Sequence, residues 1–172
     1  MNLRDEILAE HSKRQTARIV DWIGDDPERF KELMRLFLGD VYRITQRAGW
    51  PLSNCIEKYP ELVKPYFSQL LKQVERDDIH IAVKRNVVRL LQFVEIPKRY
   101  DGRIFDACYR LLDDPKEPVA VRVFSMTVAA NIAKKSPELL DELRLVAMKY
   151  PDLMTPGFRA RMRHVFGKNY AS

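Results

Sequence analysis

The sequence contains little glycine, few cysteines and no long apolar run. Only 6 of its 172 residues are glycine, and no serine- or glycine-rich stretch divides it, so we expect one domain over residues 1–172. Cys55 and Cys108 lack metal-ligand spacing and are expected to be reduced thiols in the core. No run of about 18 apolar residues occurs, which argues against a membrane-spanning helix. Residues 1–15 are charged throughout, unlike a signal peptide, so we expect a cytoplasmic protein.

Recognisable catalytic motifs are also missing. The three histidines, His11, His80 and His164, are far apart and none begins a metal-binding motif. There is no glycine-rich phosphate loop and no nucleophile motif. We therefore expect no cofactor, no metal and no enzymatic activity, although a site assembled from several repeats would leave no local motif.

The composition is that of a folded protein with a basic surface. Hydrophobic residues make up 46% of the chain and charged residues 31%, which excludes a disordered tail. The formal net charge is +6. This moderate excess is compatible with an acidic protein partner, a nucleic acid or an anionic surface.

Four aspartates recur at intervals of 38, 36 and 38 residues: Asp40, Asp78, Asp114 and Asp152. Amphipathic runs with helical spacing precede them, and further runs follow them. The preceding runs are Glu28–Leu38, Glu61–Arg76, Gly102–Leu112 and Pro137–Met148. The following runs are Val41–Lys58, Ile79–Glu95, Glu117–Lys135 and Pro156–Lys168. The pattern predicts an all-α fold of about four helix pairs, with repeats at about 26–58, 59–96, 97–135 and 136–169.

Prolines and aspartates separate these helices. Ser136-Pro137-Glu138 is a typical helix start, with a hydroxyl cap followed by proline and an acid. The pairs Asp77-Asp78 and Asp113-Asp114 are expected to form tight turns within the second and third pairs. Residues 2–23 are expected to form one further helix, and residues 1–25 would then cap the open end of the stack.

The segment from Asp113 to Ala133 shows the most specific pattern. It reads Asp-Asp-Pro-Lys-Glu-Pro-Val-Ala-Val-Arg and continues with small and aliphatic residues. This resembles the turn and second helix of a HEAT repeat, and Asp77 to Val94 is a looser copy. The resemblance covers roughly residues 26–169. It implies a right-handed α-α superhelix whose second helices line the concave side, and it says little about function.

An arginine follows each recurring aspartate seven or eight residues later: Arg47, Arg85, Arg122 and Arg159. In HEAT-like stacks such residues commonly bond to one another between adjacent repeats. We therefore expect this Asp/Arg ladder to be mainly structural.

The interiors of the second helices contain no aspartate or glutamate, whereas arginines are frequent there. Three arginine pairs have i,i+4 spacing, which places each pair on one helical face. If the second helices line the concave side, that side is a basic surface. The predicted partner-binding residues are Arg43, Arg47, Trp50, Lys84, Arg85, Arg89, Arg122, Arg159 and Arg163. The alternatives are that some arginines reach carboxylates of neighbouring repeats and that Trp50 is a core residue.

These observations favour a monomeric, non-catalytic scaffold that holds an acidic protein segment through arginine–carboxylate contacts. The alternative is nucleic-acid binding through arginine–phosphate contacts along the same surface. A third hypothesis comes from a family of DNA glycosylases that also uses HEAT-like repeats, with a carboxylate on the concave side. The acid-free second helices supply no such carboxylate, which argues against this activity.

Overall fold

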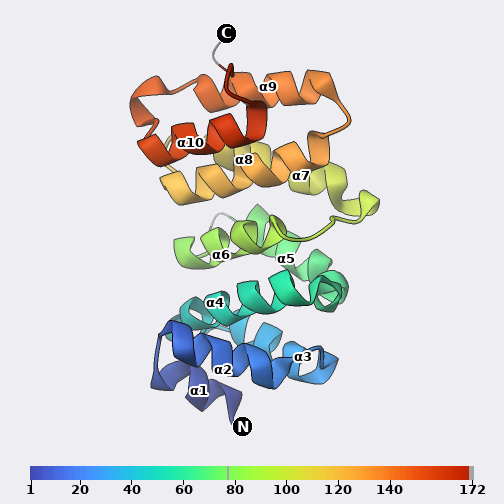
Figure 1. The fold of residues 1–172 in the computed structure, drawn as a ribbon, viewed down its shortest axis with the longest axis vertical. Helices are drawn as coiled ribbons and strands as arrows, with labels where there is room; N and C mark the ends of the chain where they lie inside the picture. The colour runs from blue at the N-terminus through green and yellow to red at the C-terminus, as the bar shows by residue number, and fades with distance from the viewer. Residues whose placement is uncertain (77, 171–172) are drawn as a thin grey trace. The chain divides into compact units, whose positions relative to one another are not determined.

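A computed structural model describes residues 1–76 and 78–170, and every regular element within them is helical. The predicted all-α fold is therefore confirmed, and Figure 1 shows the order of the elements. The handedness of the superhelix remains a prediction. Asp77, which was expected in a turn, lies outside the described residues.

The chain divides into two compact units, Met1–Val94 and Glu95–Ser172. Unit 1 contains the following elements: α1 (Leu3–Ala9), α2 (Lys13–Ile23), α3 (Pro27–Phe37), α4 (Tyr42–Lys58), η1 (Pro60–Tyr66), α5 (Phe67–Glu75) and α6 (Ile81–Leu91). Unit 2 contains α7 (Lys98–Asp113), α8 (Val119–Ala133), α9 (Pro137–Met148), η2 (Pro151–Leu153) and α10 (Pro156–Phe166). The prediction of a single domain remains a prediction.

The N-terminal segment forms two helices, so the expectation of one helix over residues 2–23 was wrong. The backbone is extended at Glu10 and at Ser12, and this break separates α1 from α2. Ser12 Oγ accepts a hydrogen bond from the Gln15 amide at 3.1 Å, which satisfies one of the unpaired N–H groups at the start of α2. Because α1 and α2 pack on each other, the segment is itself a helix pair.

The first helix of the second pair was predicted as one run over residues 61–76. In the structure it begins as the 3-10 segment η1 and continues as the shorter α-helix α5. Pro65 explains the change, because proline has no N–H to donate and disfavours α-helical backbone at the preceding residue. The α4 helix, in contrast, continues through Pro51 to Lys58.

The core of unit 1 is built from helix faces with the expected periodicity. Phe30, Leu33 and Phe37 of α3 are fully buried, as are Ala48 and Leu52 of α4. The α4 and α6 helices are in close contact at Gly49. A Cβ atom at this position would lie 2.1 Å from Asn86 Nδ2 and 3.2 Å from Asn86 Cβ. The absence of a side chain at Gly49 therefore allows α6 to pack directly on α4.

Unit 2 has its own core. Ile104, Cys108 and Leu112 of α7 face Val121 and Met126 of α8, and all five are buried. Pro137 and Pro156 each occupy the first turn of their helices, where the missing N–H is tolerated. The helix starts predicted at these two prolines are therefore confirmed. The hydroxyl cap expected at Ser136 is not formed, because Ser136 Oγ is directed to the Glu138 carboxylate at 3.5 Å instead of a backbone N–H.

Replacing Gly49 by alanine is expected to lower the free energy of unfolding of unit 1 by about 1–3 kcal/mol, because buried Asn86 must move away from the added methyl group. Urea unfolding followed by far-UV circular dichroism, which reports on the helices of both units, measures this loss. Gly102→Ala on α7 is the matched control, since a Cβ there meets no atom within 4 Å. It should leave stability unchanged or raise it by up to about 1 kcal/mol. An equal change in the free energy of unfolding for both substitutions would contradict the close contact between Gly49 and Asn86.

The two cysteines are expected to resist thiol reagents in the folded protein. Burial raises the pKa of Cys55 and Cys108 to about 12. Unfolding restores the ordinary pKa, so these thiols stabilise the fold below pH of about 9, and this contribution declines as the pH rises toward about 12. Labelling with iodoacetamide, followed by peptide mass spectrometry, should show slow modification at both residues. Fast labelling of Cys108 alone would contradict its burial in unit 2.

Candidate partner-binding site

Six of the predicted residues lie on two neighbouring helices of unit 1, and we call five of them, all except the buried Lys84, the α4–α6 face. They are Arg43, Arg47 and Trp50 of α4, and Arg85 and Arg89 of α6. The two helices pack side by side through their apolar residues, which leaves the polar positions at i,i+4 spacing toward the outside. Arg43 and Arg85 are exposed, whereas Arg47, Trp50 and Arg89 are half-buried.

The charges of the α4–α6 face are only partly compensated. Within the part of the chain that the structure describes, the side chains of Arg43, Arg85 and Arg89 form no ion pair and no hydrogen bond. The sequence of α6 contains no acid, and the only acid of α4 is Glu57, near its end. The face therefore carries positive charge that an external anion can approach without displacing an internal partner.

Arg47 and Trp50 contact the N-terminal segment. The Nη1 atom of Arg47 donates a hydrogen bond to the carbonyl oxygen of Leu8 at 2.7 Å, at the end of α1. This contact satisfies one of the carbonyls that a helix C-terminus leaves unpaired. The ring of Trp50 meets that of His11 edge-on, with 5.4 Å between ring centres. Both residues therefore hold the α1–α2 connection in addition to bordering the face.

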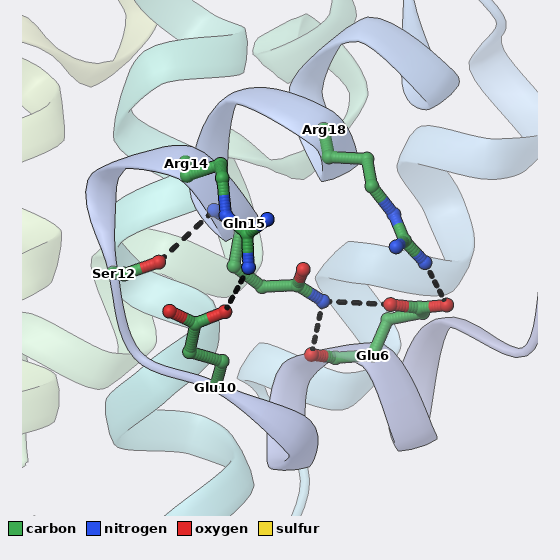
Figure 2. Close-up of polar contacts among 6 residues, drawn as sticks. All are labelled: Glu6, Glu10, Ser12, Arg14, Gln15 and Arg18. Carbon is green, nitrogen blue, oxygen red and sulfur yellow. Dashed lines mark hydrogen bonds and ion pairs between the residues drawn. The ribbon is translucent and has the colours of Figure 1, made fainter.

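A polar cluster between α1 and α2 was not predicted from the sequence. Figure 2 shows Arg18 and Gln15 of α2 pointing toward Glu6 of α1. Arg18 forms an ion pair with the Glu6 carboxylate. Gln15 Nε2 donates to the same carboxylate at 2.6 Å and to the Glu6 carbonyl at 2.8 Å. These contacts link residues 9 and 12 positions apart, so helical periodicity within one helix does not reveal them.

A second contact of the cluster lies at the connection between α1 and α2. Arg14 Nη2 donates to the Glu10 carboxylate at 3.2 Å. Hydrogen bonds from Ser12 and then from Arg14 lower the pKa of Glu10. The cluster as a whole therefore attaches an acidic helix, α1, to basic residues of α2.

Lys84 and Arg122 do not lie on an accessible surface, in contrast to the prediction. The residue Lys84 is 7% exposed. Arg122 is 1% exposed in the core of unit 2, where its Nε donates to the carbonyl of Leu112 at 3.0 Å. Its guanidinium carbon lies 5.1 Å from the ring centre of Phe158. Burial lowers the pKa of Arg122, while the neighbouring Tyr150 and Asp113 act in the opposite direction.

Arg159 and Arg163 belong to α10 in unit 2, and both are exposed. Arg159 Nη2 lies 3.4 Å from the carbonyl oxygen of Pro151, which is a long hydrogen bond. The side chain of Arg163 forms no hydrogen bond or ion pair among the described residues. These two residues are thus presented by a different unit from the α4–α6 face.

The expected Asp/Arg ladder does not form within either unit, among the residues described. Asp78 forms a two-point ion pair with Arg76, with both N–O distances at 2.9 Å, and Asp114 accepts a hydrogen bond from the Lys116 amide at 2.8 Å. Three ladder arginines donate instead to backbone carbonyls, namely Arg47 to Leu8, Arg122 to Leu112 and Arg159 to Pro151. For Arg47 and Arg122 the reason is that the last carbonyls of a helix lack intrahelical partners and attract cationic donors. The acceptor of Arg159 differs, because Pro151 is the first residue of η2.

Among residues 1–76 and 78–170, no group of three or more His, Cys, Asp or Glu side chains is arranged to hold a metal ion. No helix in the same residues has the length and apolar character needed to cross a membrane.

The repeat pattern and the helix pairs define the class of protein. The HEAT repeat domain family matches residues 3–169, so the chain belongs to this family. The match includes α1 and α2, in agreement with the helix pair found there. The resemblance expected from residues 113–133 is thereby confirmed.

The chain is also similar to the ATP-dependent DNA helicase Hel308 of Thermococcus kodakarensis, with 29% identity over 129 residues. The similarity covers 69% of this chain but 11% of the helicase. No solved structure gives a significant match.

Replacing Arg122 by alanine is expected to destabilise unit 2 by about 2–5 kcal/mol, because it leaves a cavity and removes the bond to Leu112. Methionine should cost less than about 2 kcal/mol, since it fills the space and the buried Nη2 atom has no hydrogen-bond partner to lose. Urea unfolding followed by far-UV circular dichroism compares the two variants. If both lose the same stability, the guanidinium itself holds the core together.

Proposed function

We propose that the protein is a non-catalytic binding module that holds an acidic segment of another protein on the α4–α6 face. The observation that carries this proposal is the set of exposed or half-buried arginines, Arg43, Arg85 and Arg89, without internal counter-charges. Guanidinium groups bind carboxylates through two parallel hydrogen bonds, and such charge-assisted bonds are stronger than neutral ones.

Membership of the HEAT repeat family supports a role in binding other macromolecules. Repeats of this kind stack helices into extended surfaces, and a rigid helical surface presents charges at fixed spacing. Arg85 and Arg89 of α6 are one helical turn apart, so two acidic residues at similar spacing would meet them together. The monomeric state and the cytoplasmic location remain predictions.

Nucleic-acid binding is the second candidate, and the similarity to a DNA helicase favours it. Arginines without internal partners bind phosphates as well as carboxylates, and Trp50 could stack on a base at the edge of the face. The two candidates differ in their dependence on salt. Phosphate contacts release condensed counterions, so nucleic-acid binding weakens steeply between about 50 and 200 mM salt.

The test is charge reversal of Arg85 and Arg89 to glutamate. Fluorescence anisotropy would follow two labelled probes, a peptide rich in aspartate and glutamate and a single-stranded DNA oligonucleotide. The proposal expects the wild type to bind the acidic peptide, and the double variant to bind it about tenfold or more weakly, since each lost charge-assisted hydrogen bond is worth about 1.5–3 kcal/mol.

Lys134→Glu combined with Lys135→Glu is the matched control, because it changes the net charge equally at two exposed positions of unit 2. This control should retain most of the peptide affinity. Equal losses in both double variants would reveal a response to net charge alone and contradict the site. A different outcome is that the protein binds the oligonucleotide and not the peptide, and loses that binding when Arg85 and Arg89 are reversed in charge. This result would favour nucleic-acid binding over the proposed function.

A further inference from the structure

Two cavities of unit 1 flank the turn from Gly39 to Tyr42, between α3 and α4. The first, of about 380 Å³, lies beside Arg4 of α1 and Arg35 of α3. The second, of about 220 Å³, lies between Tyr42 and the start of α6. Both cavities are bordered by Gly39 and Asp40, so they share these two residues of the turn.

The first cavity combines an apolar wall with a basic edge. Leu36, Val41 and Ile44 supply the wall. The guanidinium groups of Arg4 and Arg35 are exposed and form no ion pair or hydrogen bond in the described part of unit 1. An apolar hollow edged by uncompensated arginines suits a ligand that carries both a large apolar group and a carboxylate.

Large apolar side chains remain exposed beside these cavities. Val41 is 52% exposed, Tyr42 46% and Ile81 39%. The rings of Tyr42 and His80 lie 4.1 Å apart between centres, which brings the start of α4 next to the start of α6. Val41 and Tyr42 are therefore exposed next to each other at the turn, and exposed Ile81 directly follows His80 in the chain.

The charge around this surface is positive on balance. Arg4, Arg35 and Arg43 are exposed, and the acids that line the two cavities are Asp40 and Asp78. Asp78 is already paired with Arg76 through two contacts of 2.9 Å. An incoming acidic group therefore meets more free cations than free carboxylates.

We propose that this surface, which we define by Arg4, Arg35, Val41, Tyr42 and Ile81 and call the turn surface, binds a short protein segment that alternates acidic and large apolar residues. One apolar side chain of the segment enters the cavity beside Val41, and its carboxylates contact Arg4 and Arg35. The inference rests on the proposed function in taking the partner to be an acidic protein, but it names a second surface and adds an apolar requirement. The exposed aliphatic side chains favour a peptide over a phosphate backbone, which would leave them unused.

The experiment uses the full chain and two labelled peptides of equal charge. In the first peptide, aspartate and glutamate alternate with leucine and phenylalanine, and in the second, serine replaces each leucine and phenylalanine. Fluorescence anisotropy should show the first peptide binding roughly tenfold to a hundredfold more tightly, as expected for burial of one large apolar side chain.

Two variants locate the site. Arg4→Glu combined with Arg35→Glu removes the basic edge, and Val41→Asp places a charge beside the cavity. Val41 is the N-cap residue of α4 and makes no side-chain cap, so aspartate there is compatible with folding. Each variant should weaken binding of the first peptide about tenfold or more, while Lys134→Glu with Lys135→Glu preserves it.

The outcomes separate this inference from the proposed function. Equal affinity for the two peptides, or no binding of the first, overturns the inference. Loss of binding in the Arg85→Glu, Arg89→Glu variant alone also overturns it but supports the α4–α6 face. Loss in the turn-surface variants alone supports the inference and contradicts that face as the site. Oligonucleotide binding that Arg4→Glu with Arg35→Glu abolishes and Val41→Asp leaves unchanged would assign the surface to nucleic acid and overturn the inference.

Discussion

The close approach of α4 and α6 at Gly49 is the contact on which the organisation of unit 1 depends. With no Cβ on Gly49, the buried Asn86 of α6 lies directly against the backbone of α4. The α4 helix carries Arg43 and Arg47, and the α6 helix carries Arg85 and Arg89. At the starts of the same two helices the rings of Tyr42 and His80 lie 4.1 Å apart between centres. A side chain at Gly49 is expected to move the two helices apart, and with them the arginines of the α4–α6 face.

Much of the fold could be predicted because the pattern of apolar residues repeats. The helices around Asp40, Asp114 and Asp152 were found close to their true bounds, since each presents an apolar face at helical spacing. The break at residues 10–12 was missed because both sides of it are helical and only Ser12 marks the cap. The 3-10 segment η1 was missed because two prolines alter the geometry without changing the apolar pattern.

The candidate site was less predictable, because exposure and pairing depend on contacts between helices. Arg122 and Arg85 occupy similar places in their repeats, yet one lies in a core against Phe158 and the other faces solvent. The acceptors also could not be predicted. The last carbonyls of a helix are available as acceptors whatever the sequence. The sequence therefore does not indicate that the carbonyl of Leu8 accepts from Arg47, which is 39 residues away. The turn surface went unnoticed for the same reason, since its arginines come from α1 and α3.

The hydrogen bond from Arg47 to Leu8 has a thermodynamic consequence for the N-terminal helix. Arg47 borders the α4–α6 face, so a ligand that recruits its guanidinium competes with the last carbonyls of α1. Docking of α1 and occupation of the face are then linked equilibria, and linkage is reciprocal. If docking of α1 weakens the binding of such a ligand by a certain factor, binding of the ligand weakens the docking of α1 by the same factor. The N-terminal helix thus competes with such a ligand for one guanidinium group, that of Arg47.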